Sequence, residues 1–569
     1  MDRIPGLLPF LFLFHLLLFP SAAFAARAPV SEATEECLAC HASLHPGIVA
    51  DWRKSRHAEV APETALKVTG LARKVSAESV PEELAKTSVG CAECHTLRPE
   101  AHADTFDHVG AAIHVVVSPD DCAVCHVDEA AQYGENLMSH AHGNLTRNPV
   151  YRQLEEAVLG SPVRAEGRVV QNPPSAATRA EGCLHCHGTR LTVRGMTTRD
   201  TMMGEMMFPK IDGWPNQGAG RINPDGSRGS CAACHTRHLF SIETARKPHT
   251  CKKCHVGPDV PAYKVYSASK HGNLYSSHGD DWDFRKVPWT AGADFNAPTC
   301  ATCHISLVVN TDGAVVAERT HRMSGRLPWR IFGLIYAHPH PANPDTTTIR
   351  NREGLPLPTS LDGTFATEHL LITPAEQARR TETMQAVCLG CHHADWVTGH
   401  WDRFENTIRT SNAAIRTATQ IMNDIWSRGY AKGIAQGENP FDESVERMWS
   451  DAWLFYGNTI RFASAMAGGG DYGVFADGRY QLNQTIRDLD DWLDLRTRLF
   501  PSEGPMADAP GNGTPQDGPR LSLRRNRHSG LFPPRRALRV SSGEFSVPAF
   551  KGEAGRPSNP GAGLLPESP

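Results

Sequence analysis

The chain has 569 residues and a formal net charge of −4, from 58 lysines and arginines against 62 aspartates and glutamates. A charge this close to balance gives no support for nucleic-acid binding, which depends on a basic surface. The unusual part of the composition is its 16 cysteines and 28 histidines. Their arrangement determines most of what the sequence predicts.

The N-terminus has the features of a secretory signal peptide. Arg3 precedes an apolar run from Leu7 to Phe19, and Ala23-Phe24-Ala25 offers a small-residue cleavage site. The run is too short for a stable membrane span. We therefore expect residues 1–25 to be removed by cleavage near Ala25, and the mature protein to be periplasmic. An uncleaved membrane anchor is the alternative.

Residues 26–400 contain every cysteine, and all of them belong to eight copies of Cys-x-x-Cys-His. This is the attachment pattern of c-type haem, in which two thiols bond to the porphyrin and the histidine binds its iron. A redox dithiol or half of a zinc site explains one copy, but not a histidine after all eight. The sequence predicts eight covalent c-type haems, attached through Cys37, Cys40, Cys91, Cys94, Cys122, Cys125, Cys183, Cys186, Cys231, Cys234, Cys251, Cys254, Cys300, Cys303, Cys388 and Cys391. Their proximal iron ligands are His41, His95, His126, His187, His235, His255, His304 and His392.

Between these motifs, glycine, proline and short polar runs are frequent and long helical periodicity is scarce. We expect a mainly α fold in which short helices and loops of residues 26–400 wrap around the haems. Residues 401–500 lack cysteine and read as a helical domain. Residues 501–569 are rich in proline, glycine, serine and arginine, and are predicted to be a disordered tail.

Three helices are predicted within the helical domain. The first extends from Trp401 to Arg428. In the second, apolar residues from Val445 to Ile460 recur at intervals of three and four, as on one face of a helix. The third extends from Asp477 to Leu499. Helices of this length suggest a bundle packed on the haem region or on neighbouring subunits.

Twenty histidines remain after the eight proximal ligands are subtracted from the total of 28. A haem iron with two histidine ligands is saturated and passes electrons, whereas an open sixth position binds substrate. For each candidate, a surface or hydrogen-bonded histidine is the alternative, and the sequence does not pair them with haems. The candidates for distal ligands are His57, His108, His114, His140, His238, His271, His321 and His400.

The chain resembles the octahaem hydroxylamine oxidoreductase family over about residues 35–500. The resemblance lies in the stretch Gly218–Ser230 before the fifth motif, in Gly257-Pro-Asp-Val260 and Lys270-His-Gly272 after the sixth, and in Ile331–His340. It implies a catalytic haem at the fourth motif and seven haems that act as electron wires with two histidine ligands each. The last five motifs also resemble those of pentahaem ammonium-forming nitrite reductase, whose first haem is the active one.

The resemblance also implies a role for three side chains. His187 is the proximal ligand of the catalytic haem, and Asp259 matches the aspartate of an Asp-His pair in members that oxidise hydroxylamine. Here the histidine of that pair is replaced by Val260. Tyr472 is the candidate for the tyrosine that cross-links to the active haem of a neighbouring subunit in the family, although its surroundings depart from that pattern. An exposed turn carboxylate and a packing tyrosine are the alternatives.

These departures favour the reductive members of the family, which reduce nitrite or hydroxylamine. Oxidation of hydroxylamine at a tyrosine-cross-linked haem is the first alternative, and an electron conduit with all eight haems saturated is the second. The expected partners are a small nitrogen compound as substrate and a periplasmic or membrane-linked cytochrome c as electron partner. The resemblance implies a homotrimer.

Overall fold

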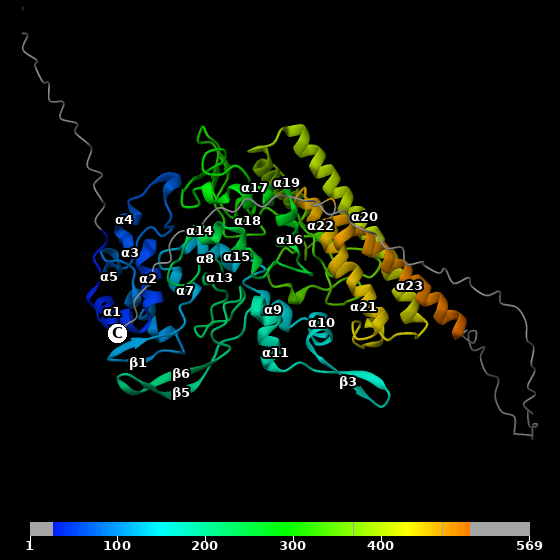
Figure 1. Cartoon of the computed structure of the whole chain (residues 1–569), viewed down its shortest axis with the longest axis horizontal. Coiled ribbons are helices and arrows are strands. Elements are labelled where there is room, and N and C mark those ends of the chain that lie inside the picture. Colours follow the sequence, from blue (N-terminus) through cyan, green and yellow to red (C-terminus); the bar gives the residue numbers. More distant parts are fainter. Residues whose placement is uncertain (1–26, 368, 469, 471, 501–569) are drawn as a thin grey trace, which may run out of the picture. The chain divides into compact units, whose positions relative to one another are not determined.

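A computed structural model of the chain describes residues 27–500 with the exception of residues 368, 469 and 471 (Figure 1). These residues belong to one compact unit that ends at Ser502. The predicted signal peptide and the predicted tail lie outside the described residues. Within the described part, no helix is both long and apolar enough to cross a membrane.

Short helices make up most of the region that carries the cysteine motifs, as predicted. They are α1 (Glu32–Leu44), α2 (Pro46–Lys54), α3 (Arg56–Glu59), α4 (Pro62–Leu66), α5 (Glu82–Ala85), α6 (Cys91–His95), α7 (Pro119–Cys122), α8 (Val127–Gly134), α9 (Ala141–Thr146), α10 (Pro149–Leu159), α11 (Ala176–Glu181), α12 (Cys183–His187), α13 (Ala232–His235), α14 (Ile242–Arg246), α15 (Pro248–Lys252), α16 (Ala262–Ala268), α17 (Lys270–His278), α18 (Cys300–His304) and α19 (Pro374–Leu389). The mainly α fold is therefore confirmed.

The strands form small, separate sheets between these helices. Four antiparallel pairs are β1 (Phe106–His108) with β2 (Ala111–Ile113), β3 (Ser161–Ala165) with β4 (Arg168–Asn172), β5 (Thr192–Thr201) with β6 (Gly204–Asp212), and β10 (Trp329–Arg330) with β11 (His338–Pro339). In the remaining sheet, β8 (Val308–Val309) pairs in parallel with β7 (Trp289–Thr290) and antiparallel with β9 (Val315–Ala317).

Hydrogen bonds at helix starts explain why the motif helices are one turn long yet well placed. At α6, Glu93 accepts from the backbone N–H of Gly90 at 2.9 Å and from the Thr34 hydroxyl of α1 at 2.7 Å. At α18, the Thr302 hydroxyl accepts from the backbone N–H of Thr299 at 3.0 Å. Such caps satisfy the N–H groups that a helix start leaves free. They fix each motif to its neighbours without a long helix.

Four helices form the C-terminal region, and Figure 1 shows them in yellow to orange. They are α20 (Ala394–Ser427), α21 (Ser444–Asp451), α22 (Asn458–Ala465) and α23 (Arg479–Leu499), of which α20 and α23 are the longest in the described part of the chain. The first predicted helix starts earlier than expected, at Ala394, because the His393 side chain caps it by accepting from the backbone N–H of Asp395. The predicted boundary between residues 400 and 401 thus falls inside α20.

The second predicted helix is interrupted by a π-helical turn at Ala452–Gly457, which separates α21 from α22. An added Cβ at Gly457 would lie 2.6 Å from Ile415 of α20, so the glycine permits a close helix approach. Around this contact, Ile415, Met422, Trp449 and Trp453 are fully buried in the largest apolar cluster of the described residues. The helical region therefore has its own packed core.

Truncation of Ile415 to alanine is expected to destabilise this core by about 2–5 kcal/mol, because it removes buried apolar atoms and leaves a cavity. The exposed Leu495 of α23 provides the matched control, and Leu495→Ala should change stability by less than about 0.5 kcal/mol. Thermal unfolding followed by circular dichroism compares the two variants. Equal shifts in Tm would contradict this account of the core.

Candidate functional site

All sixteen motif cysteines lie in the described part of the chain, and none forms a disulfide. In α6, α12 and α18 the whole motif forms a single helical turn, which holds both thiols and the following histidine together. Free, unpaired thiols beside an imidazole are the donor set that covalent haem attachment requires. The residues present therefore fit a c-type haem at each motif.

Four proximal histidines each face a second histidine from elsewhere in the chain. An iron between two imidazoles places the ring centres about 6 Å apart, because each metal–nitrogen bond is about 2 Å long. Five ring pairs have centroid distances of this size. In one of them, His95 with His114 at 6.0 Å, both ring nitrogens of His114 contact backbone carbonyl oxygens instead. The other four are His41 with His108 at 6.2 Å, His126 with His57 at 6.3 Å, His235 with His321 at 6.3 Å and His392 with His271 at 6.0 Å. The structure thus brings together four of the predicted distal ligands with four proximal ones.

The motifs also lie beside one another in a defined order. Thiols of different motifs lie close enough to shift one another's pKa. The strongest influences are between the first and second, third and fifth, fourth and sixth, and sixth and seventh motifs, in the pairs Cys37–Cys91, Cys122–Cys231, Cys186–Cys254 and Cys251–Cys300. Weaker electrostatic influences on the pKa connect the second motif with the third, the fifth with the sixth, and the seventh with the eighth, in the pairs Cys94–Cys125, Cys234–Cys251 and Cys303–Cys388. The series runs 1–2–3–5–6–7–8, and the fourth motif branches from the sixth.

In several proximal histidines, Nδ1, the ring nitrogen that would not bind the iron, lies within hydrogen-bond distance of an acceptor. Nδ1 of His95 lies 2.8 Å from the carbonyl oxygen of His114, and Nδ1 of His187 lies 3.3 Å from that of Ala141. At the first motif the acceptor is another imidazole, because Nδ1 of His41 lies 2.8 Å from Nδ1 of His45. Such contacts orient a ligating imidazole and raise its basicity.

The fourth motif has a distinct environment. Burial is the largest influence on His187 and lowers its pKa, while the carboxylate of Asp259 acts to raise it and the guanidinium of Arg330 acts to lower it. Both charged groups therefore lie near this imidazole. In the described part of the chain, no second histidine ring lies about 6 Å from the ring of His187, and the same is true of His255 and His304.

The loop that carries Asp259 is held by the helical region. Asn458 of α22 donates to the Asp259 carbonyl oxygen at 2.8 Å. Asn458 in turn accepts from the fully buried Arg461, whose guanidinium also donates to the carbonyl oxygen of Ile331 at 3.1 Å. The Asp259 side chain itself is exposed. Through Asn458 and the Arg461 guanidinium, helix α22 thus holds the backbone of both the Asp259 loop and the segment that begins at Ile331.

Val260 and Tyr472 lie in one apolar cluster. Both pack against Val265, Phe462 and Ala463, which are buried. The Tyr472 hydroxyl donates to Asp477 at 3.4 Å, and burial raises the pKa of this tyrosine. The structure therefore places Tyr472 near the Asp259 loop of its own chain.

The other predicted distal ligands have different surroundings. Burial and then the charge of His95 lower the pKa of His238 to about 4, which places His238 near the second motif. His140 donates from Nε2 to the carbonyl oxygen of Gly134 at 3.1 Å. His400 is buried and stacks on Trp396 at 5.2 Å, and Trp396 stacks on His392 at 4.0 Å.

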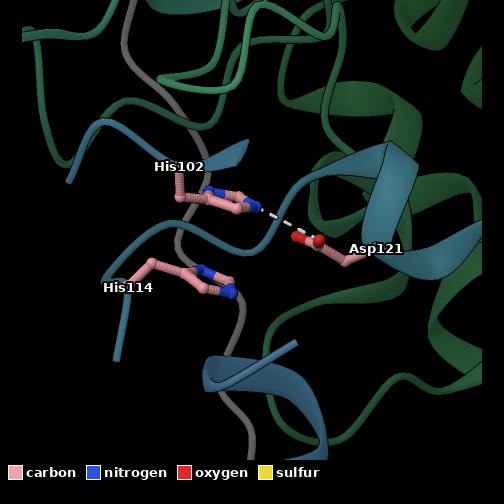
Figure 2. A group of neighbouring side chains, drawn as sticks. All are labelled: His102, His114 and Asp121. Carbon is pink, nitrogen blue, oxygen red and sulfur yellow. Dashed lines mark hydrogen bonds and ion pairs between the residues drawn. The ribbon is translucent and has the colours of Figure 1, made fainter. Parts of the chain in front are cut away.

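His114 belongs to a buried polar cluster that sequence reasoning did not anticipate (Figure 2). Its ring centre lies 6.0 Å from that of the proximal His95, but its ring nitrogens lie 2.9 and 3.1 Å from the carbonyl oxygens of Leu97 and Val116, so both nitrogens already have partners. Its ring stacks at 3.7 Å on that of His102, whose Nε2 lies 3.1 Å from a carboxylate oxygen of Asp121. The three side chains are close enough to hold a metal ion, yet the carbonyl contacts occupy both nitrogens of His114.

Two more histidines escaped the sequence analysis. His338 and His340 are buried, and Nε2 of His338 has no hydrogen-bond partner. His338 lines a cavity of about 20 Å³ together with Arg330 and Tyr151, which is room for about one water-sized molecule. The pattern His338-Pro-His340 within the segment Ile331–His340, which resembles the hydroxylamine oxidoreductase family, could have identified these two histidines from the sequence.

Comparisons with known proteins agree with this picture. A family model described as seven-times multihaem cytochrome CxxCH matches residues 223–322. A solved structure titled hypothetical multihaem protein has 39% sequence identity and a TM-score of 0.78, and the match covers 84% of this chain and 98% of that chain. A Kuenenia stuttgartiensis reducing HAO-like protein complex has 17% identity and a TM-score of 0.53, covering 83% of this chain and 87% of that chain, which shows a shared fold.

Among curated proteins, the probable nitrite reductase-hydroxylamine oxidoreductase fusion protein of Kuenenia stuttgartiensis is 27% identical over 279 residues. The matched stretch is 48% of this chain and 25% of that protein, so the chain spans about a quarter of the relative's length. The motifs and fold define a c-type cytochrome with several covalent haems. More particularly, the chain belongs to the multihaem cytochromes c, and its resemblance to the hydroxylamine oxidoreductase family is confirmed.

Replacement of a paired distal histidine should open one iron. His321→Gly is expected to create one additional carbon monoxide site per chain in the dithionite-reduced protein, because a ferrous iron with only His235 binds an added ligand. The exposed His278 provides the control, and His278→Gly should bind no extra carbon monoxide. Absorption titration measures the stoichiometry, and equal binding by both variants would show that His321 is not a ligand.

The His102 cluster should give the protein a pH-dependent stability. Burial acts to lower the pKa of His102, but the Asp104 carboxylate 3.5 Å from its Nδ1 and the hydrogen-bonded Asp121 outweigh burial and raise the pKa to about 9. Its stabilising charge is therefore fully present below about pH 6.5, the ordinary histidine value, and is lost as the pH rises through about 9. The Tm advantage of the unsubstituted protein over His102→Asn should shrink between these values, and a constant difference would contradict the assignment.

Proposed function

We propose that this chain carries eight covalent c-type haems and reduces nitrite or hydroxylamine at the haem attached by the fourth motif. The observation that carries the proposal is the position of Asp259 and Arg330 near His187, with Val260 turned into an apolar cluster. A guanidinium attracts a small anion, and a carboxylate exchanges protons with it. Valine at position 260 supplies no second proton-handling group.

The open haem iron supplies the bond-making and bond-breaking chemistry for a small nitrogen compound, and the protein supplies position, protons and tuned potentials. His187 holds the group from the proximal side, oriented by the carbonyl oxygen of Ala141. Asn458 and Arg461 hold the Asp259 backbone. Reduction of nitrite to ammonium takes up eight protons with six electrons, so a carboxylate at this loop has a continuing role as proton carrier.

The remaining motifs act as electron wires in this proposal. His108, His57, His321 and His271 are the distal ligands paired with His41, His126, His235 and His392, because their ring spacing fits an intervening iron. The mutual influence of neighbouring thiols on their pKa supports a route for electrons along the series. The fourth motif lies beside the sixth, so electrons reach it through one neighbour.

The proposal extends to the cellular setting. The signal-peptide features favour an exported, periplasmic protein. A cytochrome c is the proposed electron partner and a homotrimer the proposed assembly, both on the strength of the family resemblance. Tyr472 packs beside Val260 within its own chain. Hydroxylamine oxidation remains the competing function, and a red-shifted absorption band of a cross-linked haem after dithionite reduction is its signature.

Asp259→Asn is expected to lower kcat for nitrite and hydroxylamine reduction about a hundredfold or more, because it removes the proton-exchanging group. Oxidation of reduced methyl viologen on addition of each substrate provides the assay, and ammonium is quantified as product. Asp281→Asn alters an exposed aspartate of the same region and should retain full activity. Absence of nitrite-dependent viologen oxidation in the unsubstituted protein would overturn the reductive assignment, and absence of any cyanide-induced spectral change would favour a saturated conduit.

A further inference from the structure

The first motif lies at one end of the series of neighbouring motifs, and its surface is open. Among the sixteen motif cysteines only Cys40, Cys254 and Cys391 are exposed. Cys40 belongs to the first motif, whose only motif neighbour in the series is the second. With Cys40 exposed, a haem bonded to this motif would be reachable from the protein surface. The first motif is therefore a terminus from which electrons can pass between proteins.

Exposed apolar side chains surround this motif on both sides of its paired histidines. Leu44 and Ile48, which follow His41 in α1 and α2, are 45% and 43% exposed. On the side of the distal His108, Val109 in the β1–β2 turn is 71% exposed. Val109 also has a φ of 57°, a left-handed conformation that is strained for a β-branched residue. The turn therefore holds an apolar side chain outward in spite of backbone strain.

The charge next to this apolar surface is acidic. Helix α1 carries exposed Glu32, Glu35 and Glu36 and has no lysine or arginine between its first and last residues. The other terminus of the series, the eighth motif, has exposed Leu389 and Trp396, but Asp395 and Glu382 there are accompanied by Arg379 and Arg403. Helix α1 thus carries charge of one sign beside the first motif, and the nearest exposed cations of the following helix, Arg53 and Lys54, lie in the last turn of α2, away from Ile48 at its start.

We propose that the surface formed by α1, the start of α2 and the β1–β2 turn is the docking site for a small c-type cytochrome whose haem edge is ringed by lysines. The lysines pair with Glu32, Glu35 and Glu36, and Leu44, Ile48 and Val109 exclude water between the two haem edges. His41 and His108 would hold the haem iron of this motif, which would accept one electron from the reduced partner, with no proton or bond exchanged. Small, transient contacts of this kind are typical of electron-transfer pairs.

This inference rests on the proposed function only for the direction of electron flow, so its test needs no nitrogen substrate. Reduced mitochondrial-type cytochrome c, which has a lysine-ringed haem edge, is mixed with the oxidised full-length haem protein in a stopped-flow instrument. The charge-reversed variant Glu32→Lys, Glu35→Lys, Glu36→Lys should lower the second-order rate constant at least tenfold at low ionic strength. The difference should shrink in high salt, because exposed charges are then screened.

Two controls make the result specific. Asp488→Lys, Asp490→Lys, Asp491→Lys produces the same change in net charge on exposed residues of α23 and should leave the rate constant within about twofold of the unsubstituted value. Ile48→Ser should lower the rate constant at every ionic strength, since it weakens apolar contact and not charge. Haem content by pyridine haemochrome verifies that each variant is fully loaded.

Other outcomes overturn the proposal. An equal decrease of the rate constant in the α1 and α23 variants would show a general charge effect. A decrease only in Leu389→Ser or Trp396→Ser would place the docking site at the eighth motif. A change from oligomer to monomer in the α1 variant, measured by mass photometry, would show that this surface contacts a second copy of the chain. Loss of viologen-driven nitrite reduction with normal cytochrome c oxidation would instead contradict only the proposed function.

Discussion

The constraint on which the structure depends is the geometry of covalent haem attachment. Two thiols and one imidazole must come from five consecutive residues, and a single helical turn presents them together, as in α12. Eight motifs within residues 37–392, three of which form such a turn by themselves, leave little sequence for long helices or large sheets. The chain instead fixes each turn with local caps, such as Glu93 at α6 and Thr302 at α18.

The C-terminal helical region is connected to the region of the cysteine motifs through the buried guanidinium of Arg461. Arg461 is fully buried and hydrogen-bonds to Ser411, Asn412, Asn458 and the carbonyl oxygen of Ile331. A buried charge is stable only when its donors are satisfied in this way. Because Asn458 also holds the Asp259 loop, the core of α20 and α22 and the environment of His187 are one structural unit.

Much of the fold and of the candidate site could be predicted from the sequence. The mainly α class, the C-terminal helices and the four paired distal histidines follow from patterns that are local or compositional. The π-helical turn at Ala452–Gly457 was not predictable, since the apolar spacing continues through it and only the packing of Gly457 on Ile415 shows the need for it. The stacked His102–His114 pair was equally hidden, because its partners Asp104, Asp121 and Asp225 meet only in the folded chain.

By itself the sequence determined the class of cofactor and predicted the attachment cysteines and the proximal ligands, because that chemistry is contained within five residues. Tertiary structure decided which histidine faces which haem motif, the order in which the motifs touch, and which terminus is exposed. His57 pairs with His126, and His271 with His392, across long stretches of chain. Such contacts depend on how capped turns pack against one another, and no local pattern in the chain records that packing.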